Sequence, residues 1–313
     1  MGHSGHHHDG RRLCSRRCRH RRHSLQHRPH CLRGFHVTTP SPDSFSSPDS
    51  PILIAPHPAI AGVAIFTLNR PKALNALDMA MTRALVPAIQ RVTQDPAIRV
   101  VIVQGSGEHF MAGGDIKSFA ETLGEPGNER KKHFMELIST VHAGVELLQR
   151  SEVIAVAKVR GACAGFGLSL AIGCDLTVAS DDAYFASAYK TIGLTPDGGQ
   201  SYFLPRIVGV KKALELVLLS ERIKADEALR LSLVNKVVAA AELDATVDRV
   251  AASLAASARG SMAGAKRLLT TSLGNSLSEQ LNAERESFSN CAAKDDFVEG
   301  IRAFIEKRPA KFS

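Results

Sequence analysis

Two kinds of apolar pattern alternate along the chain from about residue 60 onward. Short runs rich in β-branched residues predict strands at residues 63–68, 99–103 and 153–159. Longer stretches with apolar residues three and four positions apart predict helices at residues 79–92 and 128–149. Strands that alternate with helices are typical of an α/β fold.

After residue 199 the pattern becomes mostly helical. The predicted elements are helices at residues 202–208, 211–219, 225–231, 243–256, 261–273, 277–292 and 296–306, with a strand at 233–238. Ordered structure is expected to begin near Ala61. The pattern divides the chain into an extension over residues 1–50, an α/β core over residues 51–250 and a helical assembly region over residues 251–313.

The stretch between residues 160 and 199 carries the strongest candidate chemistry. Gly161, Gly165 and Gly167 lead into an apolar helix, where the backbone can approach a bound group and unpaired N–H groups point outward. A tight turn follows and presents one carboxylate, Asp197. Hydrogen-bond donors at one end and an acid/base group at the other are what carbonyl chemistry requires.

Composition excludes several classes of protein. With 44% hydrophobic residues, a chain of 313 residues can bury a sizeable core, and no apolar run is long enough for a membrane helix. The formal charge of +8 suggests nucleic-acid binding, but nine Arg against three Asp in residues 1–50 account for +6 of it. That segment has little aromatic interleaving and the remainder is nearly neutral, so no nucleic-acid partner is expected.

The first 50 residues are rich in His, Arg, Ser and Pro, without an apolar period, and are predicted to be disordered. Cys14 and Cys18 lie near histidines, but their spacing matches no closed zinc motif, so no metal is expected. The three scattered cysteines of the body indicate a reducing, cytoplasmic compartment. An organelle transit segment at the start, and hence a mitochondrial location, is the alternative.

Seven segments in order across residues 60–313 resemble the enoyl-CoA hydratase/isomerase (crotonase) family. They are LNRPKALNAL at residues 68–77, AGGDIK at 112–117, GACAGFG at 161–167, GCD at 173–175, GLTPDGG at 193–199, LPRIVG at 204–209 and EGIRAFIEKRPAKF at 299–312. Any one glycine-rich segment is weak evidence by itself, because such loops are common tight turns. Seven in the family's order make the resemblance specific.

The resemblance implies a spiral of repeated β-β-α units with a C-terminal helical region that assembles trimers or hexamers. It implies an acyl-CoA substrate and no cofactor beyond the coenzyme A of that substrate. The thioester carbonyl would be polarised by two backbone N–H groups, those of Gly114 and Phe166. Residues that would contact the substrate or coenzyme A are Lys72, Ala112, Gly113, Asp115, Ile116, Lys117, Gly165 and Gly167. Asp115 also suits a helix N-cap.

The chain departs from the resemblance where hydratases of the family carry two glutamates. Ser169 and Tyr189 occupy those positions, and neither ionises usefully near pH 7. At Asp197 the chain resembles enoyl-CoA isomerases and ring-1,2-epoxyphenylacetyl-CoA isomerases of the family, which carry an acidic residue at that turn. One carboxylate suffices to move a proton between two carbons. The resemblance therefore favours double-bond isomerisation, with hydration or acyl-CoA hydrolysis as alternatives. A non-catalytic member of the family whose basic extension binds RNA is a third alternative. Asp197 as a turn residue, and Ser169 and Tyr189 as pocket-lining residues, stay open.

Overall fold

A computed structural model describes residues 45–313 of the chain. The predicted disordered extension therefore lies outside the described residues except for residues 45–50, in which Phe45 is buried and packs into the core. Within residues 45–313, no helix combines the length and the apolar character needed to cross a bilayer.

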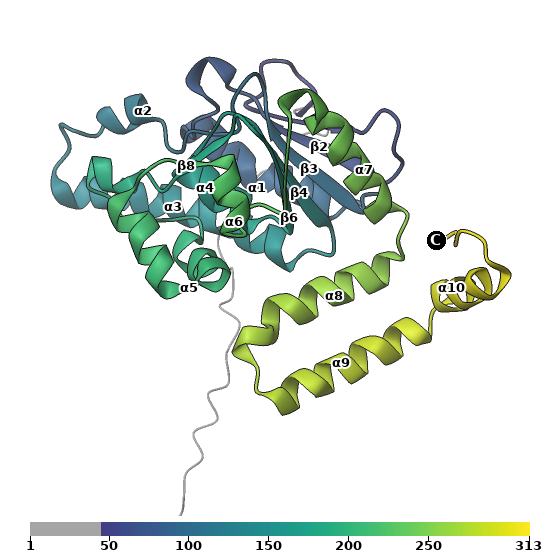
Figure 1. The fold of residues 1–313 in the computed structure, drawn as a ribbon. Helices are drawn as coiled ribbons and strands as arrows, with labels where there is room; N and C mark the ends of the chain where they lie inside the picture. Colours follow the sequence, from purple (N-terminus) through teal and green to yellow (C-terminus); the bar gives the residue numbers. More distant parts are fainter. Residues whose placement is uncertain (1–44) are drawn as a thin grey trace, which may run out of the picture. The chain divides into compact units, whose positions relative to one another are not determined.

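The main sheet has six strands, and its centre consists of the predicted β-branched runs (Figure 1). Its strands, in sheet order, are β1 (Ile52–Pro56), β2 (Val63–Leu68), β3 (Val100–Gly105), β4 (Ile154–Val159), β6 (Leu176–Ser180) and β9 (Lys236–Val238). β1 pairs antiparallel with β2, and every later pair is parallel. The prediction that order begins near Ala61 is wrong. Proline-rich flanks hide β1, whose edge position tolerates Pro56.

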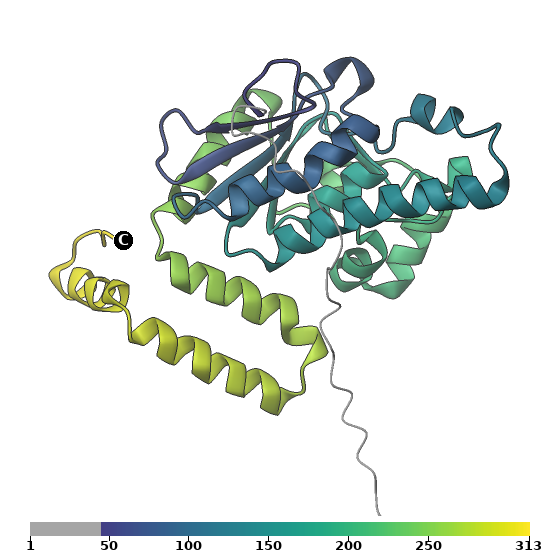
Figure 2. The same cartoon turned by 180° about the vertical axis from the view of Figure 1, so that it is seen from behind.

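Alternate residues of the strands face two different helical layers. Val101 and Val103 of β3 belong to the large core beneath α1 (Met79–Thr93) and α3 (Gly127–Arg150), which lie side by side on one face (Figure 2). Val100 and Ile102 point to the other face and pack against α7 (Leu243–Ala255). A strand buried on both faces has an unbroken apolar sequence, and this explains the pattern from which β3 was predicted.

A second sheet of three strands lies beside the start of α4 and is built by the same repeating unit. Its members are β5 (Ala162–Ala164), β7 (Tyr184–Ala186) and β8 (Ile223–Lys224), and the helices of the units are α4 (Phe166–Gly173) and α5 (Gln200–Leu219). The succession β4–β5–α4 and then β6–β7–α5 adds one strand to each sheet per unit. The predicted spiral of β-β-α units is confirmed.

The C-terminal third is helical as predicted. It comprises α6 (Ala225–Arg230), α7, α8 (Arg259–Thr271), α9 (Leu277–Ala292) and α10 (Asp295–Glu306). α8, α9 and α10 extend away from the main sheet (Figure 1). The two helices predicted within residues 202–219 are confirmed: both lie in α5, and the backbone between them is non-helical at Gly209, whose φ is 77° and ψ 157°. The division predicted at residue 250 stays a prediction, and that residue lies inside α7.

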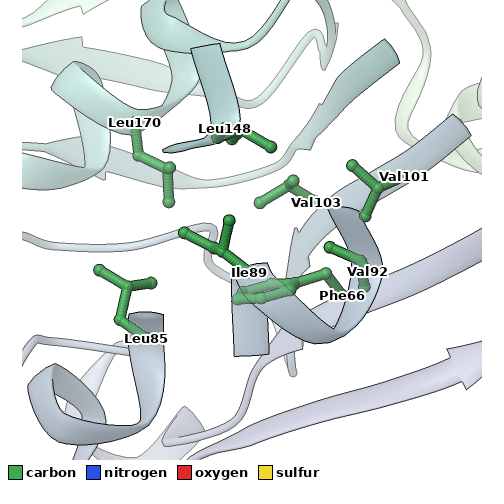
Figure 3. Close-up of a pocket in the computed structure, with 8 residues that line it drawn as sticks. All are labelled: Phe66, Leu85, Ile89, Val92, Val101, Val103, Leu148 and Leu170. Atoms are coloured by element: carbon green, nitrogen blue, oxygen red, sulfur yellow. The ribbon is translucent and has the colours of Figure 1, made fainter. Parts of the chain in front are cut away.

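The core between α1 and the sheet is closely packed. A cavity in it has a volume of about 10 Å³ and an entirely apolar lining (Figure 3). The lining residues are Phe66, Leu85, Ile89, Val92, Val101, Val103, Leu148 and Leu170. A space of that size holds at most one water molecule, so it is a packing gap and not the place of an acyl chain.

Candidate active site

The first predicted donor loop lies directly against β5. The main-chain N–H of Met111 donates to Ala162 O at 3.0 Å, and the N–H of Ala164 donates to Met111 O at 2.9 Å. These two hydrogen bonds form an isolated parallel bridge between Met111 and Cys163. A Cβ atom placed on Gly113 would lie 3.5 Å from Phe166 N and 3.1 Å from Ala164 O. The two predicted donor segments therefore touch.

Glycine at position 165 makes the second donor available. Gly165 has φ 55° and ψ −125°, a conformation that residues with a Cβ rarely adopt, and it turns the chain from β5 directly into α4. Phe166 becomes the first residue of α4, so its N–H has no partner within the helix. Since α4 has eight residues, its N-terminal dipole adds to the attraction for a developing negative charge.

Both predicted donor amides are unengaged within residues 45–313. Neither the N–H of Gly114 nor that of Phe166 donates to a protein acceptor there, whereas the N–H of Asp115 donates to Leu77 O at 2.9 Å. Leu77 N–H in turn donates to Gly113 O at 2.8 Å, which fixes the loop on that side. The structure thus brings Gly113, Gly114, Gly165 and Phe166 together with two free donors. Their joint role as an oxyanion hole stays a prediction.

Arg70 clamps the first donor loop to the segment before it. Its guanidinium lies 2.9 Å from a carboxylate oxygen of Asp115 and 3.0 Å from one of Asp78. Asp115 also accepts from Lys117 N at 3.0 Å, so its predicted role as N-cap of α2 (Ile116–Ala120) is confirmed. Burial opposes ionisation, but the Arg70 pair and the cap hydrogen bonds hold the pKa of Asp115 below its ordinary value. Asp115 therefore stays an anion and cannot supply a proton.

The two predicted coenzyme A lysines are carried by neighbouring segments. Lys72 lies in a short 3-10 helix, η2 (Pro71–Ala73), and Lys117 lies in α2; both are exposed. Ala112 N–H donates to Leu74 O at 3.0 Å and so joins the two segments. Ile116 beside Lys117 is an exposed apolar side chain. Cationic and apolar side chains on adjoining segments suit a phosphate-bearing ligand with a flat base, and the role of Lys72 and Lys117 in binding coenzyme A stays a prediction.

The Asp197 turn packs onto the start of α4. A Cβ atom placed on Gly198 would lie 2.6 Å from the Phe166 ring and 3.0 Å from Ser169 Cβ. The Asp197 carboxylate accepts a short hydrogen bond from the Tyr189 hydroxyl, and Ser169 Oγ donates to the Asp197 main-chain oxygen at 2.9 Å. The structure therefore gathers Asp197, Ser169 and Tyr189 beside the second donor. Their catalytic roles stay predictions.

Burial dominates the proton affinity of this cluster. It raises the pKa of Asp197 above its ordinary value, although the Tyr189 hydrogen bond and the proximity of His142 oppose the shift. Burial, together with the charge of Asp197, also raises the pKa of the Tyr189 hydroxyl far above its ordinary value. Tyr189 is therefore a neutral donor at physiological pH, and Asp197 is the group in the cluster that can exchange a proton.

Two residues near the site were not predicted to matter. The buried side-chain amide of Asn75 donates to His109 O at 2.8 Å and Ser106 O at 3.0 Å, and so shapes the approach to the first donor loop. His142 on α3 is exposed, but its Nε2 accepts from Gly198 N at 3.2 Å. Neither role has a local signal, because each partner is more than thirty residues away in the chain.

The sequence pattern of the family described as enoyl-CoA hydratase/isomerase matches residues 59–313, which include every segment of the site. The chain belongs to the enoyl-CoA hydratase/isomerase family. It follows that the protein is an enzyme of the group that acts on acyl-CoA thioesters.

Individual relatives are named either as hydratases or as isomerases. The chain is 35% identical to a short-chain-enoyl-CoA hydratase of Clostridium acetobutylicum over 79% of its own length and 92% of the relative's. It is 29% identical to a trans-2-decenoyl-acyl-carrier-protein isomerase of Streptococcus mutans over 80% and 95%. The crystal structure of an enoyl-CoA hydratase from Polaromonas sp. JS666 superposes with a TM-score of 0.78 at 33% identity, covering 84% of this chain and 99% of that one. Hydratase is the more frequent name among the relatives.

Proposed function

We propose that this family member is an enoyl-CoA isomerase, which moves a carbon–carbon double bond with Asp197 as its proton carrier. One observation carries the proposal: the positions that the resemblance assigns to the two hydratase glutamates hold Ser169 and Tyr189, and both hydroxyls are hydrogen-bonded to Asp197. Hydration by two carboxylates needs one group to activate water and a second to handle the carbon-bound proton. With Asp197 as the single carboxylate in this cluster, proton transfer between two carbons is the better match.

The reaction follows from the two free amides and the carboxylate. The thioester oxygen of a 3-enoyl-CoA accepts hydrogen bonds from the N–H groups of Gly114 and Phe166, and the Asp197 carboxylate removes a proton from C2. The electron pair of that C–H bond moves into a dienolate whose negative oxygen the two amides stabilise. The Asp197 carboxyl then returns the proton to C4, which leaves the double bond between C2 and C3. Each oxyanion donor is worth roughly 3–4 kcal/mol in enzymes of comparable design.

Binding of the carrier group is proposed to use the exposed edge beside the first donor loop. Lys72 and Lys117 would neutralise phosphates of coenzyme A. No further cofactor is required for this reaction, because the thioester itself supplies the electron sink. The working enzyme is proposed to be a trimer or a pair of trimers, assembled through the C-terminal helices.

Replacement of Asp197 by asparagine tests the proposed role. Asp197→Asn preserves the size and the hydrogen bond from Tyr189 but cannot take up a proton. We expect kcat for the isomerisation of cis-3-hexenoyl-CoA to fall by about a thousandfold, while KM stays within about twofold. The product is followed by the ultraviolet absorbance of the conjugated thioester. Wild-type turnover in this variant would refute the proposal.

The hydratase name of most relatives supports a second candidate, an enoyl-CoA hydratase that uses Asp197 without a glutamate pair. Incubation of crotonyl-CoA in isotopically labelled water, followed by mass spectrometry, separates the two. Label in a 3-hydroxyacyl product at a rate above that of isomerisation would establish the hydratase. Label in a free carboxylic acid would instead establish an acyl-CoA hydrolase on the same fold.

A further inference from the structure

The hydroxyl groups around Asp197 form a closed hydrogen-bonded arrangement. Tyr189 is carried by a 3-10 helix, η3 (Tyr189–Ile192), and its O–H donates to Oδ1 of Asp197. Ser169, fully buried on α4, donates to the main-chain oxygen of Asp197 at 2.9 Å. Tyr189 O and Ser169 Oγ lie 3.3 Å apart. Asp197 is thus held at its backbone by one hydroxyl and at one carboxylate oxygen by another.

Counting protons shows what this arrangement can do. A hydroxyl has one proton to donate, and the proton of Tyr189 is directed to Oδ1 while that of Ser169 is directed to a carbonyl oxygen. Oδ1 is therefore an occupied acceptor whenever Asp197 is ionised. No other residue within 45–313 donates a hydrogen bond to Oδ2, so it is the oxygen on which an incoming proton is least hindered.

We propose that Tyr189 is a positioning residue that occupies Oδ1 of Asp197 and leaves Oδ2 as the oxygen that takes and returns the substrate proton. Ser169 supports it by fixing the backbone of the same turn. This inference rests on the proposed isomerase function. It gives a role to the Tyr189 hydroxyl, which occupies one of the two positions where hydratases of the family carry a glutamate. If only Oδ2 exchanges the proton, the same atom removes it from C2 and returns it to C4. This geometry favours proton transfer on one face of the substrate.

The pH dependence of the reaction should depend on the hydrogen bond from Tyr189 to Asp197. Loss of the hydroxyl removes an interaction that favours the ionised carboxylate, so the pKa of Asp197 rises and the base form is reached only at higher pH. The other titratable group that faces Asp197 is His142 on α3, next to Gly198. A clean measurement therefore repeats the comparison in a His142→Gln background, where a side-chain oxygen can still accept from Gly198.

The experiment compares the kcat/KM profiles of wild type and Tyr189→Phe against pH with cis-3-hexenoyl-CoA. In Tyr189→Phe we expect the acidic limb of the kcat/KM profile to move to higher pH by about one unit, both with His142 present and in the His142→Gln background. We expect kcat on the plateau to fall by about tenfold with KM unchanged. Tyr202→Phe, which changes an exposed tyrosine that packs against Arg206, should leave both limbs in place. An unmoved acidic limb in Tyr189→Phe, whatever its rate, overturns the positioning role.

A second measurement does not depend on whether Tyr189→Phe folds. The chain has three tyrosines, so 3-fluorotyrosine incorporated into a Tyr184→Phe/Tyr202→Phe enzyme labels position 189 alone. Fluorination makes the phenol a stronger donor, and the acidic limb should then move downward. If the proposed isomerase role of Asp197 is itself wrong, Asp197→Asn keeps its activity, and this outcome separates that failure from a failure of the positioning role. If Asp197→Asn is inactive and neither tyrosine change moves the limb, only the positioning role is refuted.

Discussion

Asp197 shows how one side chain can serve the chemistry of the site at the expense of stability. Its carboxyl lies among Phe166, Ser169 and Tyr189, where burial opposes charge, and the hydroxyl of Tyr189 offsets that effect in part. A base with raised proton affinity in an apolar setting transfers protons more readily near neutral pH than an exposed aspartate does. The same burial means that the ionised form weakens the fold.

A stability measurement should reveal this cost as a dependence on pH. The pKa of Asp197 is higher in the folded protein than in the unfolded chain, so the folded state binds the proton more tightly and loses relative stability as pH rises through the folded value. Asp197→Asn has no charge to bury. We expect the variant to gain free energy of unfolding relative to wild type as pH is raised from below the ordinary aspartate pKa to neutrality, measured by urea denaturation. A difference that is constant with pH would contradict the assigned burial.

Gly113 offers a test of the donor pair that leaves both amides in the chain. Its φ is 95°, and a Cβ there would press on Ala164 O and approach Phe166 N. Gly113→Ala should lower kcat/KM by about a hundredfold, comparable to the loss of one oxyanion donor, and destabilise the fold by roughly 1–3 kcal/mol. Gly124→Ala is the matched control, because its Cβ would meet nothing within 4 Å. Equal kinetics of the two variants would show that the loops need not touch.

Among the elements, α8 is tied to the sheet by one buried cation. Lys266 Nζ lies 2.9 Å from a carboxylate oxygen of Asp175 and donates to Val153 O at 2.9 Å and Leu148 O at 3.1 Å. Its side chain is 5% exposed, so water replaces none of these contacts easily. The end of α3 and the residues that directly precede β4 and β6 thereby meet at a single ammonium group. The point where the C-terminal helices leave the core is thus defined by electrostatics as well as by packing.

Removal of that cation should be costly. Lys266→Met leaves the Asp175 carboxylate without its cation, although the Ala155 N–H still donates to it at 2.8 Å. We expect the free energy of unfolding to fall by about 3 kcal/mol. Urea denaturation gives the value, with the neighbouring exposed Arg267→Met as a control that should change it by less than about 0.5 kcal/mol. The double variant Lys266→Met/Asp175→Asn should recover part of the loss, since it removes the unpaired charge. No recovery would indicate that packing of the lysine stem dominates.

At the scale of the whole molecule, the last helices carry an apolar surface that no part of residues 45–313 buries. None of the residues of α9 is buried, although a capping box of Ser276 and Glu279 begins the helix well. Leu277, Leu281 and Phe288 fall on one stripe of the helix, and Leu277 and Phe288 are 75% and 74% exposed. Stable helices with such a stripe are normally covered, which favours a second copy of this chain as the partner.

Charge placed on the stripe should therefore change the size of the particle in solution. We expect the wild-type protein to sediment as a trimer or hexamer and Leu281→Asp/Phe288→Asp to sediment as a monomer, because two buried carboxylates would oppose association. Glu286→Gln, on the opposite side of α9, should keep the wild-type size. A monomeric wild-type protein, measured by analytical ultracentrifugation at micromolar concentration, would refute the assembly.

The sequence by itself determined the elements that depend on local periodicity. The parallel strands β2, β3 and β4 and the helices α1, α3 and α9 were predicted within a few residues, because an apolar strand or a helical stripe is written in consecutive positions. The loops rich in glycine and the lone Asp197 were also visible, since glycine and a carboxylate are recognisable by type. β1 was missed, because its proline-rich surroundings do not resemble a strand.

Tertiary structure alone decided which distant groups meet. Four contacts join positions that are far apart in the chain. They are the pairing of Met111 with β5, the hydrogen bond from Tyr189 to Asp197, the hydrogen bond from Gly198 to His142, and the ion pair of Lys266. A hydrogen bond or an ion pair depends on distance and direction in space, and neither is encoded in any single stretch. Residue types thus identified what chemistry was possible, and the packing of two sheets and α4 decided where it is assembled.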